Sequence, residues 1–141
     1  MSCQKKLQYL IHDNFEAYRQ AHVDHFNVTG EDFVQYHSLL KDLYEKLFEY
    51  HDTLAETLRT MDTFVDHSHD CKSDCVIEEH NGDRSTSAVV LRSISNLQSL
   101  VKTATGIEAE ASKERHVALV NVLGDYCQDL SKLLWMLKSC Q

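Results

Sequence analysis

The sequence contains no proline and only four glycines among its 141 residues. Proline and glycine are the residues that destabilise helix interiors most, so we expect long helices with few interruptions. With 43% of its residues apolar, the chain can bury one sizeable core and is close to the commonest length of a single domain. These features predict an all-α fold in one domain that covers residues 1–141.

Positive charge is also scarce. The chain has 14 lysines and arginines against 22 aspartates and glutamates, which gives a formal net charge of −8. Broad electrostatic binding of nucleic acid needs a basic patch or arm, and the N-terminus offers only Lys5 and Lys6. DNA binding is therefore disfavoured. An acidic balance suits a protein that attracts cations, and an ordinary soluble surface explains it equally well.

Long apolar runs are missing as well. No stretch of about 18 apolar residues occurs, and the opening ten residues lack the apolar segment of a signal peptide. We therefore expect a cytoplasmic protein with no membrane span. The five cysteines are an odd number without framework spacing, and reduced thiols are expected in that compartment.

Apolar residues recur at helical steps along four segments of the chain. These steps predict four helices, over about residues 4–28, 31–62, 86–112 and 114–139. Thr29 is expected to cap the second helix, with Asp32 three residues further on. Trp135 and the leucines around it are expected to pack in the core.

The periodicity fails between the second and third helices. Residues 63–85 are rich in aspartate, histidine, serine and cysteine, which predicts a long polar connection with room for one short helix near residues 76–80. A connection of this length can cross from one end of a bundle to the other. Four long helices with one long middle crossover match a ferritin-like four-helix bundle.

Four side chains of metal-binding types lie on the first two predicted helices: His25, His37, Asp52 and Glu56. Asp52 and Glu56 are one turn apart on the same helix face. Imidazoles and carboxylates together suit Fe(II), Mn(II) or Zn(II), with iron favoured where open positions remain for an oxidant. The alternative is that these are hydrogen-bonded core histidines and carboxylates on a solvated face. His22 and His51, beside this set, are auxiliary ligands or hydrogen-bonded core residues.

His37 and Asp52 are expected to share one helix. They are fifteen residues apart, which separates them by roughly 22 Å along the helix axis. Metal ligands lie within about 2.0–2.6 Å of their ion. One copy of the helix therefore cannot close the site. An antiparallel helix must supply the rest, either from elsewhere in the chain or from a second copy of the chain.

The stretch from Ala21 to Met61 resembles the signature of the Dps mini-ferritins, a family of the ferritin-like superfamily. The matching features are the turn His25-Phe26-Asn27, then Gly30, Phe33 and His37, and the set Asp52, Ala55 and Glu56. Residues 129–137 are similar to the closing helix of that family. The resemblance therefore spans nearly the whole chain.

The resemblance implies a homo-oligomeric hollow shell, a dodecamer, with iron sites at its two-fold interfaces. There His25 and His37 of one subunit would face Asp52 and Glu56 of its neighbour. The implied activity is that of a ferroxidase: Fe(II) is oxidised with peroxide or oxygen and ferric iron is stored, which protects against oxidative damage. The implied cofactor is iron, in a di-iron or mono-iron site, and zinc is an alternative metal.

The chain departs from the family pattern at three places, the mildest of which is Phe26 after His25, where relatives commonly have tryptophan. The family has an aspartate one turn after the second histidine, where this chain has Lys41. A protonated lysine has no lone pair, repels a metal cation and can pair with a neighbour's carboxylate, so a shell without ferroxidase activity is a second hypothesis. The acidic cluster that lines an entry pore in relatives is also missing, and the nearest substitutes are Glu108, Glu110 and Glu114.

A second group of metal-binding types lies in the polar connection: His67, His69, Cys71 and Cys75, with His80 close behind. Sulfur and nitrogen ligands suit Zn(II), although this spacing matches no common zinc finger. A polar loop that merely contains histidines is one alternative, and a reversible disulfide between Cys71 and Cys75 is another.

Overall fold

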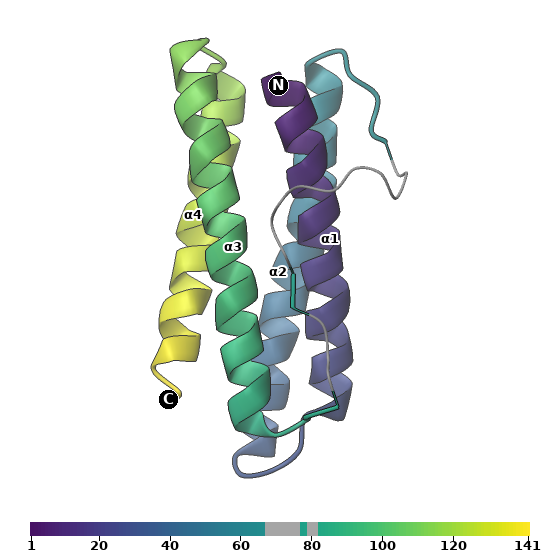
Figure 1. The fold of residues 1–141 in the computed structure, drawn as a ribbon, viewed down its shortest axis with the longest axis vertical. Helices are drawn as coiled ribbons and strands as arrows, with labels where there is room; N and C mark the ends of the chain where they lie inside the picture. Colours follow the sequence, from purple (N-terminus) through teal and green to yellow (C-terminus); the bar gives the residue numbers. More distant parts are fainter. Residues whose placement is uncertain (67–76, 79–81) are drawn as a thin grey trace.

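The structure is a computed structural model that describes residues 1–66, 77–78 and 82–141. Four long helices form it: α1 (Cys3–Asn27), α2 (Phe33–Thr60), α3 (Thr86–Lys113) and α4 (Val117–Lys138). The predicted all-α four-helix bundle is confirmed (Figure 1). None of the helices in the described ranges is long and apolar enough to cross a membrane.

The helix directions explain the long middle connection. In Figure 1, α1 and α4 run downwards, whereas α2 and α3 run upwards. Since α2 ends at the top of the bundle and α3 begins at the bottom, the chain between them must return along the length of the bundle. α1 packs against α2 and α3, and α4 packs against α3 and α2. Most of the short helix expected near residues 76–80 lies outside the described residues.

The described parts of this connection are held by amide side chains. The side chain of Gln8 donates to the carbonyl of Phe64 at 2.7 Å and accepts from the main-chain N–H of Asp66 at 3.0 Å. The side chain of Asn96 makes the same two bonds to the main chain of Glu78. It donates to the Glu78 carbonyl at 3.1 Å and accepts from the Glu78 N–H at 2.7 Å. Each amide therefore satisfies main-chain groups for which no helix provides partners.

The expectation that Thr29 caps α2 is wrong. The residue before α2 is Asp32, which has a left-handed conformation (φ 59°) and makes no side-chain cap hydrogen bond. The main chain of Thr29 is instead paired with the segment before α3, donating to the Arg84 carbonyl at 2.9 Å and accepting from the Thr86 N–H at 3.2 Å. The corner between α1 and α2 is thus tied to the start of α3.

The core is built mainly from leucines of all four helices. The largest fully buried side chains are Tyr126, Leu7, Leu10, Leu40, Leu47, Leu54, Leu58, Leu97, Leu100, Ile107, Leu119 and Leu123. The prediction that Trp135 packs in the core is wrong, because its side chain is 64% exposed. Leu133 and Leu137 take the inward positions of α4, and a residue two positions from each of them falls on the opposite side of a helix.

Asn14 joins three helices inside this apolar core. It is fully buried on α1, donates from Nδ2 to the Leu47 carbonyl of α2 at 2.8 Å, and accepts from the Tyr126 hydroxyl of α4 at 2.9 Å. Buried polar groups are costly unless they are hydrogen-bonded, so these bonds favour one arrangement of the three helices.

Candidate metal centre

The turn between α1 and α2 brings His25 and His37 into direct contact. His25 lies in the last turn of α1 and His37 in the second turn of α2, and their rings stack with centroids 3.7 Å apart and planes 18° apart. The Nδ1 atom of His25 lies 2.7 Å from the His37 carbonyl oxygen. The Nδ1 atom of His37 lies 2.8 Å from the His25 carbonyl oxygen.

These reciprocal contacts assign the protons. A carbonyl oxygen only accepts, so each Nδ1 must carry the hydrogen, and each Nε2 keeps its lone pair in the neutral ring. Metal-binding histidines commonly have this arrangement, because a hydrogen bond from one nitrogen orients the ring and leaves the other nitrogen for the ion. The pair is therefore prepared to bind a cation through Nε2.

The surroundings of His25 favour the neutral form that binding requires. His25 is only 7% exposed. Burial lowers the pKa of His25, and nearby His37, His22 and Lys41 lower it further, against the opposing effect of the hydrogen bond to the His37 carbonyl. A neutral imidazole has no proton to lose before it binds a metal ion.

His22, next to the His25–His37 pair, is hydrogen-bonded and stacked on an aromatic ring. Its ring stacks on Tyr44 with centroids 4.0 Å apart, and its Nδ1 atom lies 3.1 Å from the Tyr18 hydroxyl. The half-buried ring of His22 is thus part of an aromatic wall next to His25. This matches the hydrogen-bonding alternative that the sequence left open.

Asp52 and Glu56 lie further along α2 and face solvent. Neither carboxylate makes a hydrogen bond or an ion pair with any residue that the structure describes. Within one chain they are not brought to the histidines: no group of three ligand atoms within 4.8 Å of one another, in the described ranges, includes His25, His37, Asp52 or Glu56. In the described chain, His25 with His37 and Asp52 with Glu56 are therefore two separate pairs of candidate ligands, called the two half-sites below.

An open groove of about 730 Å³ begins beside the aromatic wall and ends at Asp52. Its lining includes Tyr18, Tyr44, Phe48 and His51, and the Phe48 side chain is 56% exposed. The Nδ1 atom of His51 is buried without a hydrogen-bond partner among the described residues, and burial lowers the pKa of this histidine. The exposed Phe48 ring and the aromatic side chains beside it give this groove a largely aromatic lining between the two half-sites.

The comparison with known proteins gives the family. The sequence model of the ferritin-like domain family matches residues 4–140. The chain belongs to the ferritin-like domain family. Its predicted resemblance to the Dps mini-ferritins is confirmed by the relatives described next.

Over 135 residues the chain is 26% identical to the DNA protection during starvation protein of Helicobacter pylori strain J99, with 94% of each chain covered. Its fold matches that of Dps from Bacillus brevis with a TM-score of 0.89, at 23% identity, over 99% of this chain and 97% of that one. It also matches Dps from Vibrio cholerae, described as a ferritin-like diiron-carboxylate protein, with a TM-score of 0.89, at 21% identity, over 97% of this chain and 87% of that one.

The lysine that departs from the Dps pattern points away from the core. The side chain of Lys41 is 56% exposed, and its ammonium lies 3.8 Å from the Glu45 carboxylate on the next turn of α2. An exposed pair of this kind is worth well under about 1 kcal/mol, so it does little to fix the lysine. The candidate ligands are therefore two imidazoles and two carboxylates, and the exposed Lys41 ammonium lies on α2 with three of these four residues.

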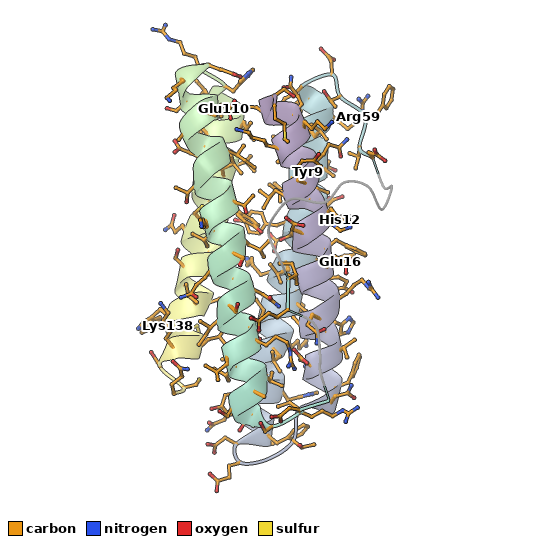
Figure 2. All side chains as sticks on the ribbon, in the orientation of Figure 1. Tyr9, His12, Glu16, Arg59, Glu110 and Lys138 are labelled. Carbon is orange, nitrogen blue, oxygen red and sulfur yellow. The ribbon has the colours of Figure 1, made fainter. Side chains whose placement is uncertain are left out.

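Glu110 and Glu114 were named above as substitutes for the missing pore carboxylates. They lie at the end of the bundle opposite His25 and His37, and both take part in ion pairs. Glu110, labelled near the top of the bundle in Figure 2, pairs with Lys6 of α1, and Glu114 lies 3.2 Å from the Nε2 atom of His116. The hydrogen bond from Lys6 lowers the pKa of Glu110. Cys3 lies beside both carboxylates, with ligand atoms within 4.8 Å, a grouping that sequence reasoning missed because residues 3 and 110 have no shared local pattern.

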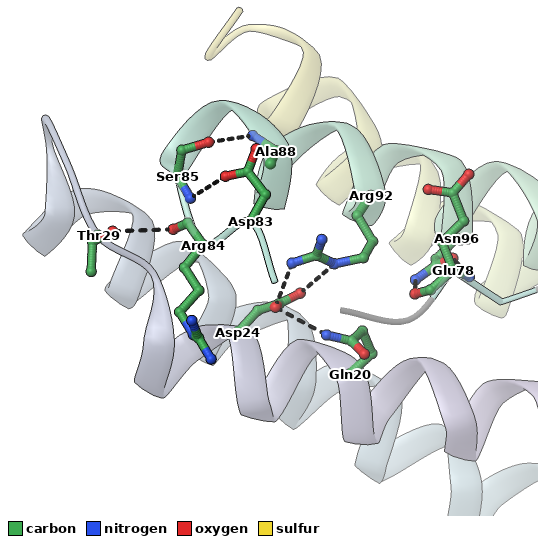
Figure 3. A network of polar contacts seen from close by, with 10 residues as sticks. All are labelled: Gln20, Asp24, Thr29, Glu78, Asp83, Arg84, Ser85, Ala88, Arg92 and Asn96. Atoms are coloured by element: carbon green, nitrogen blue, oxygen red, sulfur yellow. Dashed lines mark hydrogen bonds and ion pairs between the residues drawn. The ribbon is translucent and has the colours of Figure 1, made fainter. Parts of the chain in front are cut away.

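Sequence reasoning also missed an ion pair next to His25. Asp24 of α1 accepts from Arg92 of α3 at 2.7 Å and 3.2 Å, and from Gln20 at 3.0 Å (Figure 3). The Arg92 and Asp24 side chains are 5% and 2% exposed. This network fixes the end of α1 that carries His25. The cluster expected at His67, His69, Cys71 and Cys75, with His80, lies outside the described residues.

Proposed function

We propose that this chain is a Dps-like mini-ferritin subunit that binds Fe(II) at sites shared between two copies. There it oxidises Fe(II) with hydrogen peroxide or oxygen and stores the ferric product, protecting the cell from oxidative damage. The observation that carries the proposal is the reciprocal hydrogen bonding of His25 and His37, which leaves two Nε2 lone pairs available. Membership in the ferritin-like family supports iron storage as the general function.

A second copy is needed because of the length of α2. His37 and Asp52 are separated by roughly 22 Å within one chain, too far to share an ion. An antiparallel copy of α2, related by a two-fold axis, would place its Asp52 and Glu56 opposite these histidines, and the reverse at a second site. The exposed Phe48 lies between the half-sites, where such a partner would cover it.

The imidazoles and the carboxylates of the site would have different roles. Bound Fe(II) is the substrate and supplies the electrons that the oxidant accepts. The two imidazoles would bind it through Nε2, and the two carboxylates would offset its charge and that of the ferric product. We further propose that pairs of this kind build a closed shell of twelve subunits in the cytoplasm, and that Zn(II), which takes the same ligands, competes for the site.

A mixing experiment tests whether the site is shared. His37→Gln removes one half-site and Asp52→Asn removes the other, so each variant alone should oxidise Fe(II) no faster than buffer. When the two variants are refolded together in equal amounts, random pairing should leave about a quarter of the sites with both halves intact. The measurement is the initial rate of Fe(II) oxidation with peroxide, compared with wild type. His116→Gln, at the far end of the bundle, is the matched control.

The outcomes separate the possible arrangements. Recovery of about a quarter of the wild-type rate in the mixture supports a shared site. No recovery, with full activity in the His116→Gln control, would mean that the ligands act within one chain and would refute the shared site. A wild-type protein that oxidises Fe(II) no faster than buffer, with or without peroxide, would refute the function itself.

Lys41 motivates a second candidate function, a Dps-like shell that has lost ferroxidase activity. Its ammonium would then occupy the metal position and hold the subunits together as a structural or DNA-associated protein. An inactive parent with a Lys41→Asp variant that gains Fe(II) oxidation would favour this candidate, whereas an active parent excludes it. Retarded DNA in a gel shift at low salt would be needed for a DNA-associated role, which the net charge of −8 disfavours.

A further inference from the structure

The position of Lys41 relative to a second copy follows from the proposed shared site. If His37 of one subunit and the partner subunit's Asp52 and Glu56 bind the same ion, the two-fold axis crosses α2 halfway between position 37 and positions 52 to 56. That point lies between residues 44 and 47. Position 41 then faces positions 48 to 52 of the antiparallel partner, since antiparallel helices related by a two-fold axis pair positions symmetrically about it.

Two of the five positions that Lys41 would face carry a carboxylate. They are the partner subunit's Glu49 and the partner subunit's Asp52. In the chain itself, both of these carboxylates are exposed, and Asp52 has no ion pair or hydrogen bond within the described part of the structure. Among the described residues, the Glu49 carboxylate has one ion pair, an exposed one with Lys46 at 3.4 Å. In the same part of the chain, the ion pair of Lys41 is its exposed contact with Glu45 at 3.8 Å. Exposed pairs of this kind are weak, so both side chains are free to exchange them for a pair across the interface.

At the shared site, the negative charges of the carboxylates are balanced by one divalent metal ion together with the Lys41 ammonium. Each site would gather three carboxylates, those of the partner subunit's Glu49, the partner subunit's Asp52 and the partner subunit's Glu56. With each Nδ1 donating to a carbonyl, an imidazole can bind a metal ion through Nε2 only as a neutral ring, so the two imidazoles of a metal-bound site add no charge. One divalent ion and one ammonium bring three positive charges to these carboxylates. A second divalent ion would lie against the ammonium and be repelled by it.

We propose that Lys41 acts as a permanent second cation of the site. Across the two-fold axis its ammonium pairs with the partner subunit's Glu49 and the partner subunit's Asp52. Each site therefore binds a single divalent ion, and the ammonium offsets one of the three carboxylate charges when no metal is bound. The inference rests on the proposed shared iron site and names what that site holds. It makes Lys41 a specificity-determining residue for the number of ions.

Metal counting tests the first consequence. Anaerobic titration calorimetry with Fe(II), repeated with redox-inactive Zn(II), should give one ion per subunit that is lost in His37→Gln. Lys41→Asp should bind a second ion per subunit and bind the first on the order of tenfold more tightly, because a repelling charge becomes a ligand. Lys102→Asp, the same charge change at an exposed position of α3, should match wild type. Two ions in wild type, or equal numbers in wild type and Lys41→Asp, would overturn the proposal.

The metal-free protein provides a second readout that needs no iron chemistry. In the presence of a chelator, Lys41→Asp should dissociate at a protein concentration on the order of tenfold higher than wild type, because four carboxylates then face one another. Adding Glu49→Lys to Lys41→Asp should restore the pairing. Sedimentation velocity measures both. Equal dissociation of wild type and Lys41→Asp would overturn the inference.

The two readouts separate this inference from the proposed function. If wild type and His37→Gln bind equally little metal, the shared iron site is refuted. The lysine pairing is then decided by the metal-free dissociation alone: loss in Lys41→Asp with rescue by Glu49→Lys supports it, and loss without rescue refutes it.

Discussion

Arg92 of α3 holds the carboxylate of Asp24 at two points, one residue before His25 on α1. Both side chains are almost fully buried, so this pair lies in the low-dielectric interior. Removing one partner of a buried pair leaves an uncompensated charge, which costs far more than the pair itself contributes. The pair therefore fixes the packing of α1 on α3 next to the candidate metal centre.

Arg92→Ala should lower the free energy of unfolding by about 3–5 kcal/mol, because it leaves the buried Asp24 carboxylate unpaired. Urea unfolding followed by circular dichroism at matched subunit concentration measures the loss. The control is Arg19→Ala, which breaks an exposed pair with Glu16 and should cost less than about 1 kcal/mol. If both variants lost the same free energy of unfolding, burial of the Asp24–Arg92 pair would not explain its contribution to stability.

Asn14→Leu should lower the free energy of unfolding by about 1–3 kcal/mol. The substitution conserves volume approximately, but it leaves the Leu47 carbonyl without its side-chain donor and removes the acceptor of the Tyr126 hydroxyl. Asn121→Leu, at an exposed position of α4, is the matched control and should change stability by less than about 0.5 kcal/mol. An Asn14→Leu protein as stable as wild type would contradict the role of this network.

Phe48→Glu should separate pairs of subunits without unfolding them. The ring is 56% exposed between the two half-sites, so a carboxylate there removes apolar area that two copies would bury and must lose its hydration when they associate. Sedimentation velocity should show loss of the pair, and circular dichroism should show an unchanged helix content. Val117→Glu, at a 67% exposed apolar position at the start of α4, should keep the pair. Retained pairing in Phe48→Glu would exclude this face as the interface.

The metal-free protein should lose stability in mild acid. Burial lowers the pKa of His25 and of His51 below the ordinary value of 6.5. Because each histidine binds its proton more readily in the unfolded chain, its contribution is complete above pH 6.5 and is lost as the pH falls through the range below that value.

His51→Phe provides the test of this acid sensitivity. The substitution keeps a ring against Phe15, whose centroid lies 4.7 Å from that of His51, and removes the titrating group. The thermal midpoint of the variant, followed from about pH 7 to about pH 5 with a chelator present, should fall less steeply than that of wild type. Parallel profiles would assign the acid sensitivity to other groups.

Much of the fold could be predicted from local pattern. The apolar steps along the chain predicted four helices and the polar break between the second and third, because helical period and loop composition are properties of neighbouring residues. The same local geometry separated His37 from Asp52 by roughly 22 Å and so required a second helix at the metal site. Resemblance to the Dps signature then named the family that the comparison confirms.

Other features depended on contacts between distant segments. Trp135 has a large apolar side chain of the kind that is usually buried. It is exposed because Leu133 and Leu137 occupy the inward face of α4. Thr29 precedes a helix, yet its main chain pairs with Arg84 and Thr86, more than fifty residues later. No local pattern contains this information, because propensities describe a residue and its neighbours, whereas packing decides which side of each helix faces the core.

The sequence by itself therefore determined the helices, the candidate metal-binding residues and the distance that prevents one copy of α2 from supplying both His37 and Asp52 to one ion. The tertiary structure decided that His25 and His37 stack and fix each other's protons, and that Asp24 is held by Arg92, 68 residues away. The physical reason is the distance along the sequence over which each effect acts. Helix rise and periodicity act over a few residues, whereas tautomers, buried charges and exposed faces are set by groups that only the folded chain brings together.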